Sequence, residues 1–291
     1  MSQALPRSSS GTALITGASS GIGYETSLLL ARQGYNLVLV GRNRSALGAL
    51  ASRVRDELGV AAEVCPRDLS VNTAPDDIFA ELEQKQLVVD VLVNNAGFAI
   101  QGSYQNNDVA TLLDMIQVNI TAVTHLTRLI LPGMIRRGRG KILNISSVGA
   151  FMPGPLMAAY FASKAYVLSL SEALANELQG TGVTITALCP GPTRSKFAIR
   201  AGLTDTRAFR GTLLDPASVA QAGVDAMMKG KTVVIAGLKH RMQLLPTPLV
   251  PRRVLAYFAR QYHQTPDRGH QGPAWPAASP DSAAAKHAPQ P

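Results

Sequence analysis

Apolar runs of strand length alternate along this chain with longer stretches that have helical periodicity. The strand-like runs occupy residues 13–15, 37–40, 62–65, 89–93, 141–145, 183–188 and 232–236. Helical patterns fill the intervals, at 21–33, 45–58, 76–86, 109–135 and 158–179, and a further helix begins after its predicted cap, Asp215. Apolar strands separated by helices are typical of a parallel sheet covered on both faces. The pattern therefore predicts an α/β fold, a doubly wound parallel sheet, in a single domain over residues 11–238.

The alternation stops after about Leu238. Residues 239–265 mix leucine, proline and arginine, and they predict a basic, apolar C-terminal extension. Proline on each side of Thr247 weakens any continuous amphipathic helix there, because proline lacks an amide donor and disrupts helices. Residues 266–291 are mainly alanine, proline and small polar residues, which predicts a disordered tail, and residues 1–10 are expected to be a flexible N-terminus.

The net charge of +9 is concentrated in the C-terminal third. No acidic residue lies between Asp225 and Asp267, whereas seven basic residues do: Lys229, Lys231, Lys239, Arg241, Arg252, Arg253 and Arg260. Such a stretch fits an anionic surface such as a membrane. A solvated basic face or a subunit contact explains it equally well. No aromatic-rich stacking surface accompanies the charge, so no nucleic acid partner is expected.

Cysteine and histidine usage narrows the chemistry further. The two cysteines, Cys65 and Cys189, lie in apolar stretches, which suits a reducing compartment. The five histidines have no ligand spacing, so no metal site is expected. The first ten residues lack the apolar core of a signal peptide, and no run of about 18 apolar residues is present. The protein is therefore expected to be soluble and cytoplasmic.

A glycine-rich turn, Thr16-Gly-Ala-Ser-Ser-Gly-Ile-Gly23, joins the first strand to the first helix. Glycines permit a tight turn and close approach of a pyrophosphate, and the helix N-terminus favours the anion. Placed after the first strand, this turn predicts a Rossmann-like dinucleotide site formed by Gly17, Ser19, Ser20, Gly21, Ile22 and Gly23.

The end of the second strand bears on cofactor preference. Its sequence, Val40-Gly-Arg42-Asn-Arg44, has no carboxylate to bind a free ribose 2′-hydroxyl, and Arg42 can form a fork onto a 2′-phosphate. NADP(H) is therefore favoured over NAD(H), with Arg44 read as a solvated charge. Asp68, just past the third strand, is placed either to accept from an adenine amino group or to cap the following turn.

Tyr160 and Lys164 are four residues apart, so they share one face of a predicted helix. A buried ammonium beside a phenol is expected to lower the pKa of the tyrosine, which makes it an acid–base group near neutral pH. Ser147 lies thirteen residues upstream, where its hydroxyl can hold a carbonyl or alcohol oxygen. Taken alone, the pair favours an ordinary helix tyrosine and a lysine that reaches solvent, and only the rest of the chain reverses this.

Together, these motifs resemble the classical short-chain dehydrogenase/reductase family over residues 11–238. The resemblance rests on the ordered occurrence of Thr16-Gly-Ala-Ser-Ser-Gly-Ile-Gly23, Asp68-Leu69, Asn94-Asn-Ala-Gly97, Asn119, Ser147, Tyr160-Phe-Ala-Ser-Lys164 and Pro190-Gly-Pro-Thr193. Ser20 departs from the pattern, since many NADP-preferring members carry a basic residue there.

The resemblance implies a role for each matched residue. Tyr160 is implied as the proton donor and acceptor, Lys164 as the group that tunes it, and Ser147 as the substrate anchor. Asn119 is implied as part of a proton path, with a helix-kinking asparagine as the alternative. The implied cofactor contacts are Arg42, Asp68, Leu69, Asn95, Tyr160, Lys164 and Thr193.

The predicted function is an NADPH-dependent oxidoreductase that interconverts a carbonyl and an alcohol. Residues 196–214 are placed to form an apolar substrate lid, and Phe151, Met152 and Met157 lie near the serine. The alternatives are a non-catalytic NADP(H)-binding regulatory protein and a membrane-peripheral reductase of lipid-like carbonyls that uses residues 239–265. The resemblance also implies a homo-oligomer.

Overall fold

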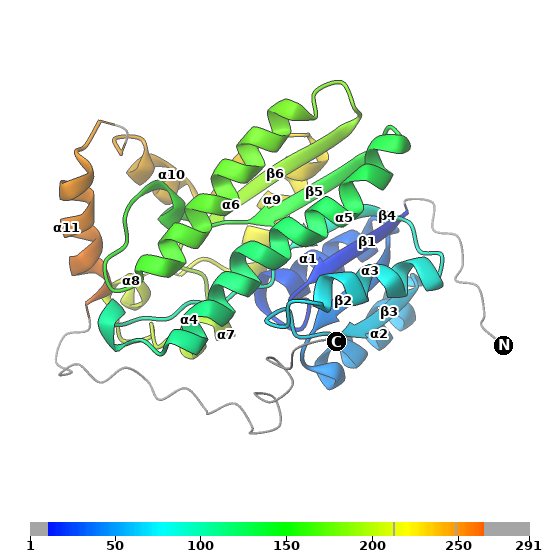
Figure 1. Ribbon diagram of the computed structural model, residues 1–291, viewed down its shortest axis with the longest axis horizontal. Helices are drawn as coiled ribbons and strands as arrows, with labels where there is room; N and C mark the ends of the chain where they lie inside the picture. The colour runs from blue at the N-terminus through cyan, green and yellow to red at the C-terminus, as the bar shows by residue number, and fades with distance from the viewer. Residues whose placement is uncertain (1–10, 212, 248, 265–291) are drawn as a thin grey trace, which may run out of the picture.

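The computed structural model describes residues 11–211, 213–247 and 249–264. Within them, seven parallel strands form one sheet in the order β3-β2-β1-β4-β5-β6-β7, as Figure 1 shows. The strands are β1 (Thr12–Thr16), β2 (Asn36–Gly41), β3 (Ala62–Pro66), β4 (Val89–Asn94), β5 (Gly140–Ile145), β6 (Val183–Pro190) and β7 (Val233–Ala236). The doubly wound parallel sheet is confirmed, whereas the expectations for residues 1–10 and 266–291 lie outside the described residues.

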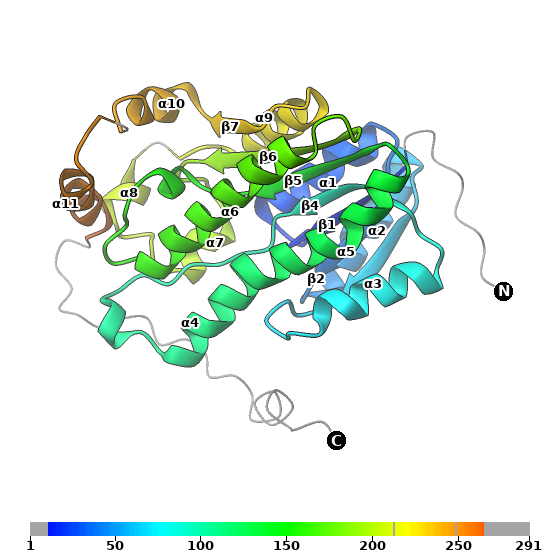
Figure 2. The ribbon, with the colours of Figure 1, turned by 45° about the horizontal axis from the view of Figure 1, so that its top comes forward.

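The sheet is buried because both of its faces carry apolar side chains. In β1, Ala13 and Ile15 face one core, formed with α1 (Gly21–Arg32), α2 (Arg44–Leu58) and α9 (Pro216–Met228). Leu14, between them, faces a second core, formed with α3 (Ala74–Gln84), α5 (Ala122–Arg136) and the end of α6 (Ala158–Glu177). Successive strand residues point to opposite faces, so an uninterrupted apolar run requires helices on both sides. Figures 1 and 2 show these two helical layers.

Helix starts follow local capping chemistry. The Asp215 side chain accepts from the Ser218 amide at 3.1 Å, as expected for the cap of α9. The helix predicted from residue 76 begins two residues earlier, at Ala74, with Pro75 in its first turn. Proline is well suited to that position because its amide would be unpaired there anyway.

The helical stretch predicted for 109–135 is divided into α4 (Val109–Ile116), a π-helical turn at Gln117–Thr121 and α5. By length and composition alone, Val109–Arg136 passes as a helix able to cross a membrane. Its buried residues, Leu126 and Ile130 among them, instead pack on β4 and β5. A core helix passes the same test, so this composition is accounted for by the sheet.

The C-terminal extension forms two helices, α10 (Leu238–Leu244) and α11 (Arg252–His263). As expected, no continuous helix runs through the proline segment, but a helix forms on each side of it. α11 packs beside α8 (Arg207–Arg210), which with α7 (Lys196–Arg200) belongs to the predicted lid. Figures 1 and 2 place α10 and α11 at the end of the molecule that also holds α8.

Candidate active site

A cavity of about 880 Å³ opens along the carboxyl ends of the strands. In doubly wound sheets this is where ligands bind, beside the point where strand order reverses, here between β1 and β4. Most of the predicted site residues line it: Gly17, Ser19, Ser20, Gly21, Ile22, Arg42, Asp68, Leu69, Asn95, Ser147, Tyr160, Lys164 and Thr193. Gly23 and Asn119 are the two predicted residues that do not line it, and both lie behind its wall.

The glycine-rich turn between β1 and α1 has the backbone that the sequence pattern requires. Gly17 and Gly21 have φ values of 67° and 60°, a region that strongly favours glycine. A Cβ at Gly17 would lie 3.0 Å from the Ala96 Cα. Without these side chains, amide groups and the start of α1 are exposed toward the cavity, which fits a pyrophosphate.

Asn95 holds this turn in place. Its amide Nδ2 donates to the carbonyl oxygens of Thr16 at 2.8 Å and Gly17 at 3.2 Å. The Thr16 hydroxyl in turn accepts from the Asn95 amide at 2.9 Å. Asn95, predicted to lie beside the cofactor, therefore borders the cavity. Its side-chain amide links the end of β4 to the glycine-rich turn after β1.

The far end of the cavity carries the groups expected at the adenine ribose. Arg42 Nη1 lies 3.9 Å from Asp68 Oδ2, and both side chains are largely exposed. Asp68 Oδ1 accepts from the Ser70 amide at 3.0 Å. Asp68 thus caps the following turn, which is one of the two roles predicted for it, and its second carboxylate oxygen faces Arg42. A loosely paired guanidinium of this kind is free to reorient onto a phosphate.

Ser147 follows the end of β5, and the two neighbouring serines there use their hydroxyls differently. Ser146 Oγ donates to the Lys164 carbonyl at 2.8 Å, deep in the protein. Ser147 Oγ accepts from the Gly149 amide at 3.0 Å, which leaves its hydroxyl proton for another acceptor. Tyr160 and Lys164 reach the same place from the first two turns of α6. The three predicted catalytic side chains are therefore brought together.

The electrostatics differ from the sequence prediction. Burial raises the pKa of Tyr160 to about 12, and hydrogen bonding with Ser147 opposes this only in part. Burial likewise lowers the pKa of Lys164 to about 8. The Lys164 Nζ donates to the Ile145 carbonyl at 2.9 Å and lies 5.8 Å from the centroid of the Tyr160 ring. The prediction of a lowered Tyr160 pKa is wrong for this state, since burial of the phenol is the largest influence on its pKa and raises it.

Asn119 sits in the π-helical turn and is fully buried. Its Oδ1 accepts from the Phe98 amide at 3.1 Å, and its Nδ2 donates to the Phe98 carbonyl at 3.0 Å and to Ser163 Oγ at 3.1 Å. A Cβ at Gly97 would lie 3.0 Å from Asn119 Oδ1 and 3.4 Å from Lys164 Nζ. Gly97 therefore borders both Asn119 and Lys164. The Asn119 side chain also satisfies backbone groups of Phe98, as the alternative interpretation required.

Six larger apolar side chains also line the cavity, together with charged residues such as Arg200 and Asp114. The six are Met152, Met157, Phe161, Phe197, Leu203 and Phe209. The Phe197 ring lies 5.6 Å from the Tyr160 ring, so the predicted lid segment packs beside the candidate catalytic tyrosine. Three residues expected in this wall are elsewhere: Phe151 packs beside β6, Ile199 of the lid segment is exposed, and Leu213 does not line the cavity.

The sequence analysis missed the contribution of the C-terminal extension. The cavity wall also includes three residues of α10 and two of α11: His240, Gln243, Leu244, Tyr262 and His263.

Specific contacts hold these two helices in the wall. The His240 ring occupies the space that a Cβ at Gly191 would need. The His263 ring meets Phe161 edge-on at 5.1 Å, and its carbonyl accepts from Gln101 Nε2 at 3.0 Å. The spacing of His240 and Leu244 on one helix face was a signal for this inner surface.

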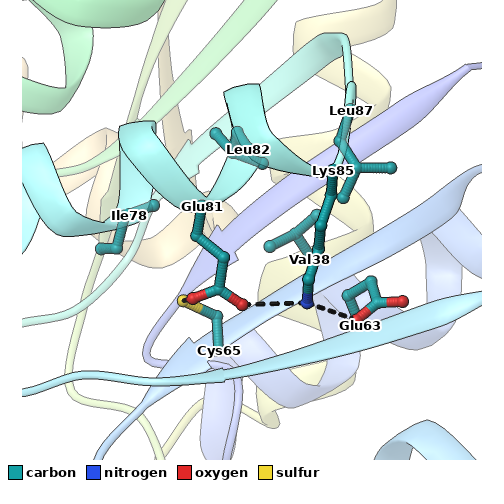
Figure 3. Close-up of a pocket in the computed structure, with 8 residues that line it drawn as sticks. All are labelled: Val38, Glu63, Cys65, Ile78, Glu81, Leu82, Lys85 and Leu87. Atoms are coloured by element: carbon teal, nitrogen blue, oxygen red, sulfur yellow. Dashed lines mark hydrogen bonds and ion pairs between the residues drawn. The ribbon is translucent and has the colours of Figure 1, made fainter. Parts of the chain in front are cut away.

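A second, far smaller cavity of about 10 Å³ lies between β3 and α3 (Figure 3). The Cys65 thiol donates to Glu81 at 3.4 Å, and Lys85 bridges Glu81 and Glu63 at 3.0 and 2.9 Å. Burial raises the pKa of the Cys65 thiol to about 12, so it is an unreactive thiol. This space holds at most one water, and it is a packing feature rather than a ligand site.

The fold and the glycine-rich turn beside the cavity are those of a dinucleotide-binding α/β protein. Residues 11–205 match the family described as short chain dehydrogenase. The ketoacyl reductase HetN of Nostoc sp. is 37% identical over 231 residues, 77% of this chain and 77% of that protein. The chain therefore belongs to the short-chain dehydrogenase/reductase family of oxidoreductases.

Two further relatives extend the comparison. A very-long-chain 3-oxoacyl-CoA reductase of Pyrenophora tritici-repentis is 38% identical over 177 residues, which are 60% of this chain and 52% of that longer one. Among solved structures, a short-chain dehydrogenase from Sphingobium yanoikuyae in complex with NADPH is 34% identical, with a TM-score of 0.74. That alignment covers 82% of this chain and 93% of the other.

Proposed function

We propose that this protein is an NADPH-dependent reductase that interconverts an apolar carbonyl compound and its alcohol. The observation that carries the proposal is one continuous cavity, which joins the glycine-rich turn to Ser147, Tyr160 and Lys164. NADPH supplies the hydride, and the protein supplies a proton and the orientation of the substrate.

In the proposed reaction the substrate oxygen lies between the hydroxyls of Ser147 and Tyr160. The charge that develops on this oxygen is stabilised by these two donors in a site largely shielded from water. Because burial raises the pKa of Tyr160 to about 12, the phenol is protonated at neutral pH and ready to give its proton. Lys164, anchored to the Ile145 carbonyl, stabilises the tyrosinate that remains.

The apolar nature of the substrate is inferred from the wall around Tyr160. The wall there is formed mainly by apolar side chains, Phe161, Phe197, Leu203 and Phe209, with the guanidinium of Arg200 also lining the cavity. The names of two relatives, a ketoacyl reductase and a very-long-chain 3-oxoacyl-CoA reductase, support a chain-like or acyl carbonyl.

The first test is a panel of apolar ketones and aldehydes assayed with NADPH and with NADH. Turnover of any member with NADPH supports the proposal. The competing function is a cofactor-sensing protein without turnover, and it is favoured if NADPH binds tightly yet no member of a broad panel is reduced.

The preference for NADPH is proposed from Arg42 at the end of β2. The Arg42→Ala variant should weaken NADPH binding by about 10- to 100-fold and leave NADH binding unchanged, because a charge-assisted bond to the 2′-phosphate is lost. Calorimetric titration with each cofactor measures this. Arg44→Ala is the matched control, since Arg44 begins α2 as an exposed side chain. An unchanged ratio of the two affinities in Arg42→Ala would remove the assignment.

The protonation state of Tyr160 predicts opposite pH behaviour for the two directions. Alcohol oxidation requires the tyrosinate, so its kcat/KM should rise roughly tenfold per pH unit from about pH 6 to pH 8, up to the pKa of about 8 at which Lys164 loses its charge. Carbonyl reduction requires the phenol, so it should change by less than about threefold over that range. Initial rates measured in both directions check this. An oxidation rate that is independent of pH from 6 to 8 would contradict it.

We further propose a homo-oligomer in the cytoplasm, with peripheral membrane contact treated below. Exposed apolar side chains of α4 and α6, Leu113 and Tyr166 among them, form the face best suited to a subunit contact. Sedimentation velocity measures the assembly.

A further inference from the structure

The helices α10 and α11 each expose an apolar stripe on the side away from the cavity. On α10 and the turn after it, the stripe is Leu238, Met242 and Leu245. On α11 it is Val254, Tyr257 and Phe258, the last with 63% of its surface exposed. Leu249, between the helices, is 88% exposed. Spacings of three and four residues put each set on one helix face, and both helices lie at the same end of the molecule (Figures 1 and 2).

Basic side chains accompany both stripes. Lys239 and Arg241 belong to α10, and Arg252, Arg253 and Arg260 to α11, and all five are exposed. No acidic residue occurs between Asp225 and Asp267, so nothing within the extension neutralises them. A helix with an apolar stripe, basic flanks and aromatic residues is typical of one that lies in the interface of an anionic bilayer.

The opposite sides of the same helices line the active-site cavity. The buried His240 and Leu244 of α10, and the buried His263 of α11, contribute to its wall. The outer stripes therefore lie only one helix thickness from the substrate site, on the order of 10 Å.

We propose that α10 and α11 dock on an anionic lipid membrane through this outer face, which we term the docking face: Leu238, Met242, Leu245, Leu249, Val254, Tyr257 and Phe258 with the five basic residues. A substrate dissolved in the bilayer then reaches the cavity beside these helices without crossing bulk water. The docking itself is independent of the proposed reductase function, whereas the delivery of a lipid substrate rests on it.

Charge distinguishes a membrane from the other occupants of such a face. In a two-fold contact with a second copy, the five basic residues of one docking face would meet the same five of the other without an acidic partner. A nucleic acid would satisfy the arginines but would leave aliphatic Leu238, Met242 and Leu249 without a partner. An anionic bilayer matches both the charge and the apolar side chains.

The test is co-sedimentation of the full chain with phosphatidylcholine vesicles that contain about 30% phosphatidylglycerol, compared with phosphatidylcholine alone. Binding is expected only to the anionic vesicles, and it should fall at least about tenfold between low and high salt. Arg253→Gln/Arg260→Gln should weaken binding about 25-fold, or about fivefold for each charge. Leu249→Ser/Phe258→Ser should weaken it at least about tenfold.

Matched controls lie at the amino-terminal ends of the strands, the end of the sheet opposite the cavity. Lys229→Gln/Lys231→Gln removes the same charge between α9 and β7, and Val88→Ser/Ile135→Ser removes exposed apolar side chains near the starts of β4 and β5. Neither control should change vesicle binding. Equal losses in the controls, or equal binding to neutral vesicles, would overturn the proposal.

Two readouts keep docking and catalysis separate. Turnover of a water-soluble ketone should be unchanged in both docking-face variants, so a failure of docking leaves the reductase intact. Vesicle binding should persist in Tyr160→Phe, so a failure of the proposed reaction leaves docking intact. A dimer in sedimentation velocity that is lost in Leu249→Ser/Phe258→Ser, without any vesicle binding, would assign the face to a second copy and reject the membrane.

Discussion

Replacing Tyr160 by phenylalanine should reduce kcat for carbonyl reduction by about 10²- to 10⁴-fold while leaving NADPH affinity within about threefold. The variant removes one oxygen from a residue that borders the cavity, and it keeps the ring that packs against Phe197. The lost group is the proton donor, so the alkoxide formed by hydride transfer has no acid beside it. Single-turnover oxidation of NADPH, followed by absorbance, separates this step from cofactor binding.

Tyr166→Phe is the matched control on the same helix. Tyr166 lies six residues further along α6, and its hydroxyl is 2.9 Å from Thr124 Oγ1, away from the cavity. The same chemical change there should alter kcat by less than about twofold. If Tyr160→Phe keeps more than about a tenth of the wild-type kcat, the proton comes from another group, and the assignment of Tyr160 fails.

The layered fold could be predicted from local pattern because each strand and helix carries its own signal. Ala13, Leu14 and Ile15 are apolar on both sides of a strand, and only a sheet covered on both faces accommodates that pattern. Asp215 and Pro75 marked helix starts through chemistry that involves neighbouring residues alone. Such signals do not depend on how distant parts of the chain pack.

The placement of Ser147, Tyr160 and Lys164 around one cavity could be predicted, but their electrostatics could not. Helical spacing placed Tyr160 beside Lys164, and the structure agrees. The direction of the Tyr160 pKa, however, depends on how much water the lid excludes and on where the Lys164 ammonium is anchored. Phe197 of α7 contributes to the exclusion of water, and the Ile145 carbonyl of β5 anchors the ammonium. Neither residue is adjacent to Tyr160 in sequence.

The role of the C-terminal extension also depends on distant packing. The charge run and the prolines were visible in the sequence, and they favoured a surface role. His240 fills the space above Gly191, and His263 contacts Phe161. Both contacts depend on tertiary packing, because β7 determines where α10 begins and α8 packs against α11. The extension thus contributes both to the cavity wall and to the exposed face of the protein, and the sequence pattern indicated only the exposed face.

Replacing Gly23 by alanine should disable the cofactor site through packing rather than through a lost contact with the ligand. Gly23 does not border the cavity, but a Cβ there would lie 2.5 Å from the Gly17 carbonyl oxygen and would collide with Asn95 Nδ2. These are the two groups whose hydrogen bond holds the glycine-rich turn. The turn must shift, so kcat/KM with NADPH should fall by about 100-fold or more, because displacements of about 1 Å are that costly.

The same variant should lower the free energy of unfolding by about 1–3 kcal/mol, as overpacking a rigid contact does. Gly48→Ala is its control: Gly48 lies within α2 with nothing within 4 Å of the added carbon. That change should raise the free energy of unfolding by about 0.5–1 kcal/mol, since alanine favours a helix interior, and it should leave NADPH binding unchanged. Denaturant unfolding and calorimetric titration measure both variants. Wild-type NADPH affinity in Gly23→Ala would mean that the turn tolerates a side chain, and the third glycine would then have no role in shaping the site.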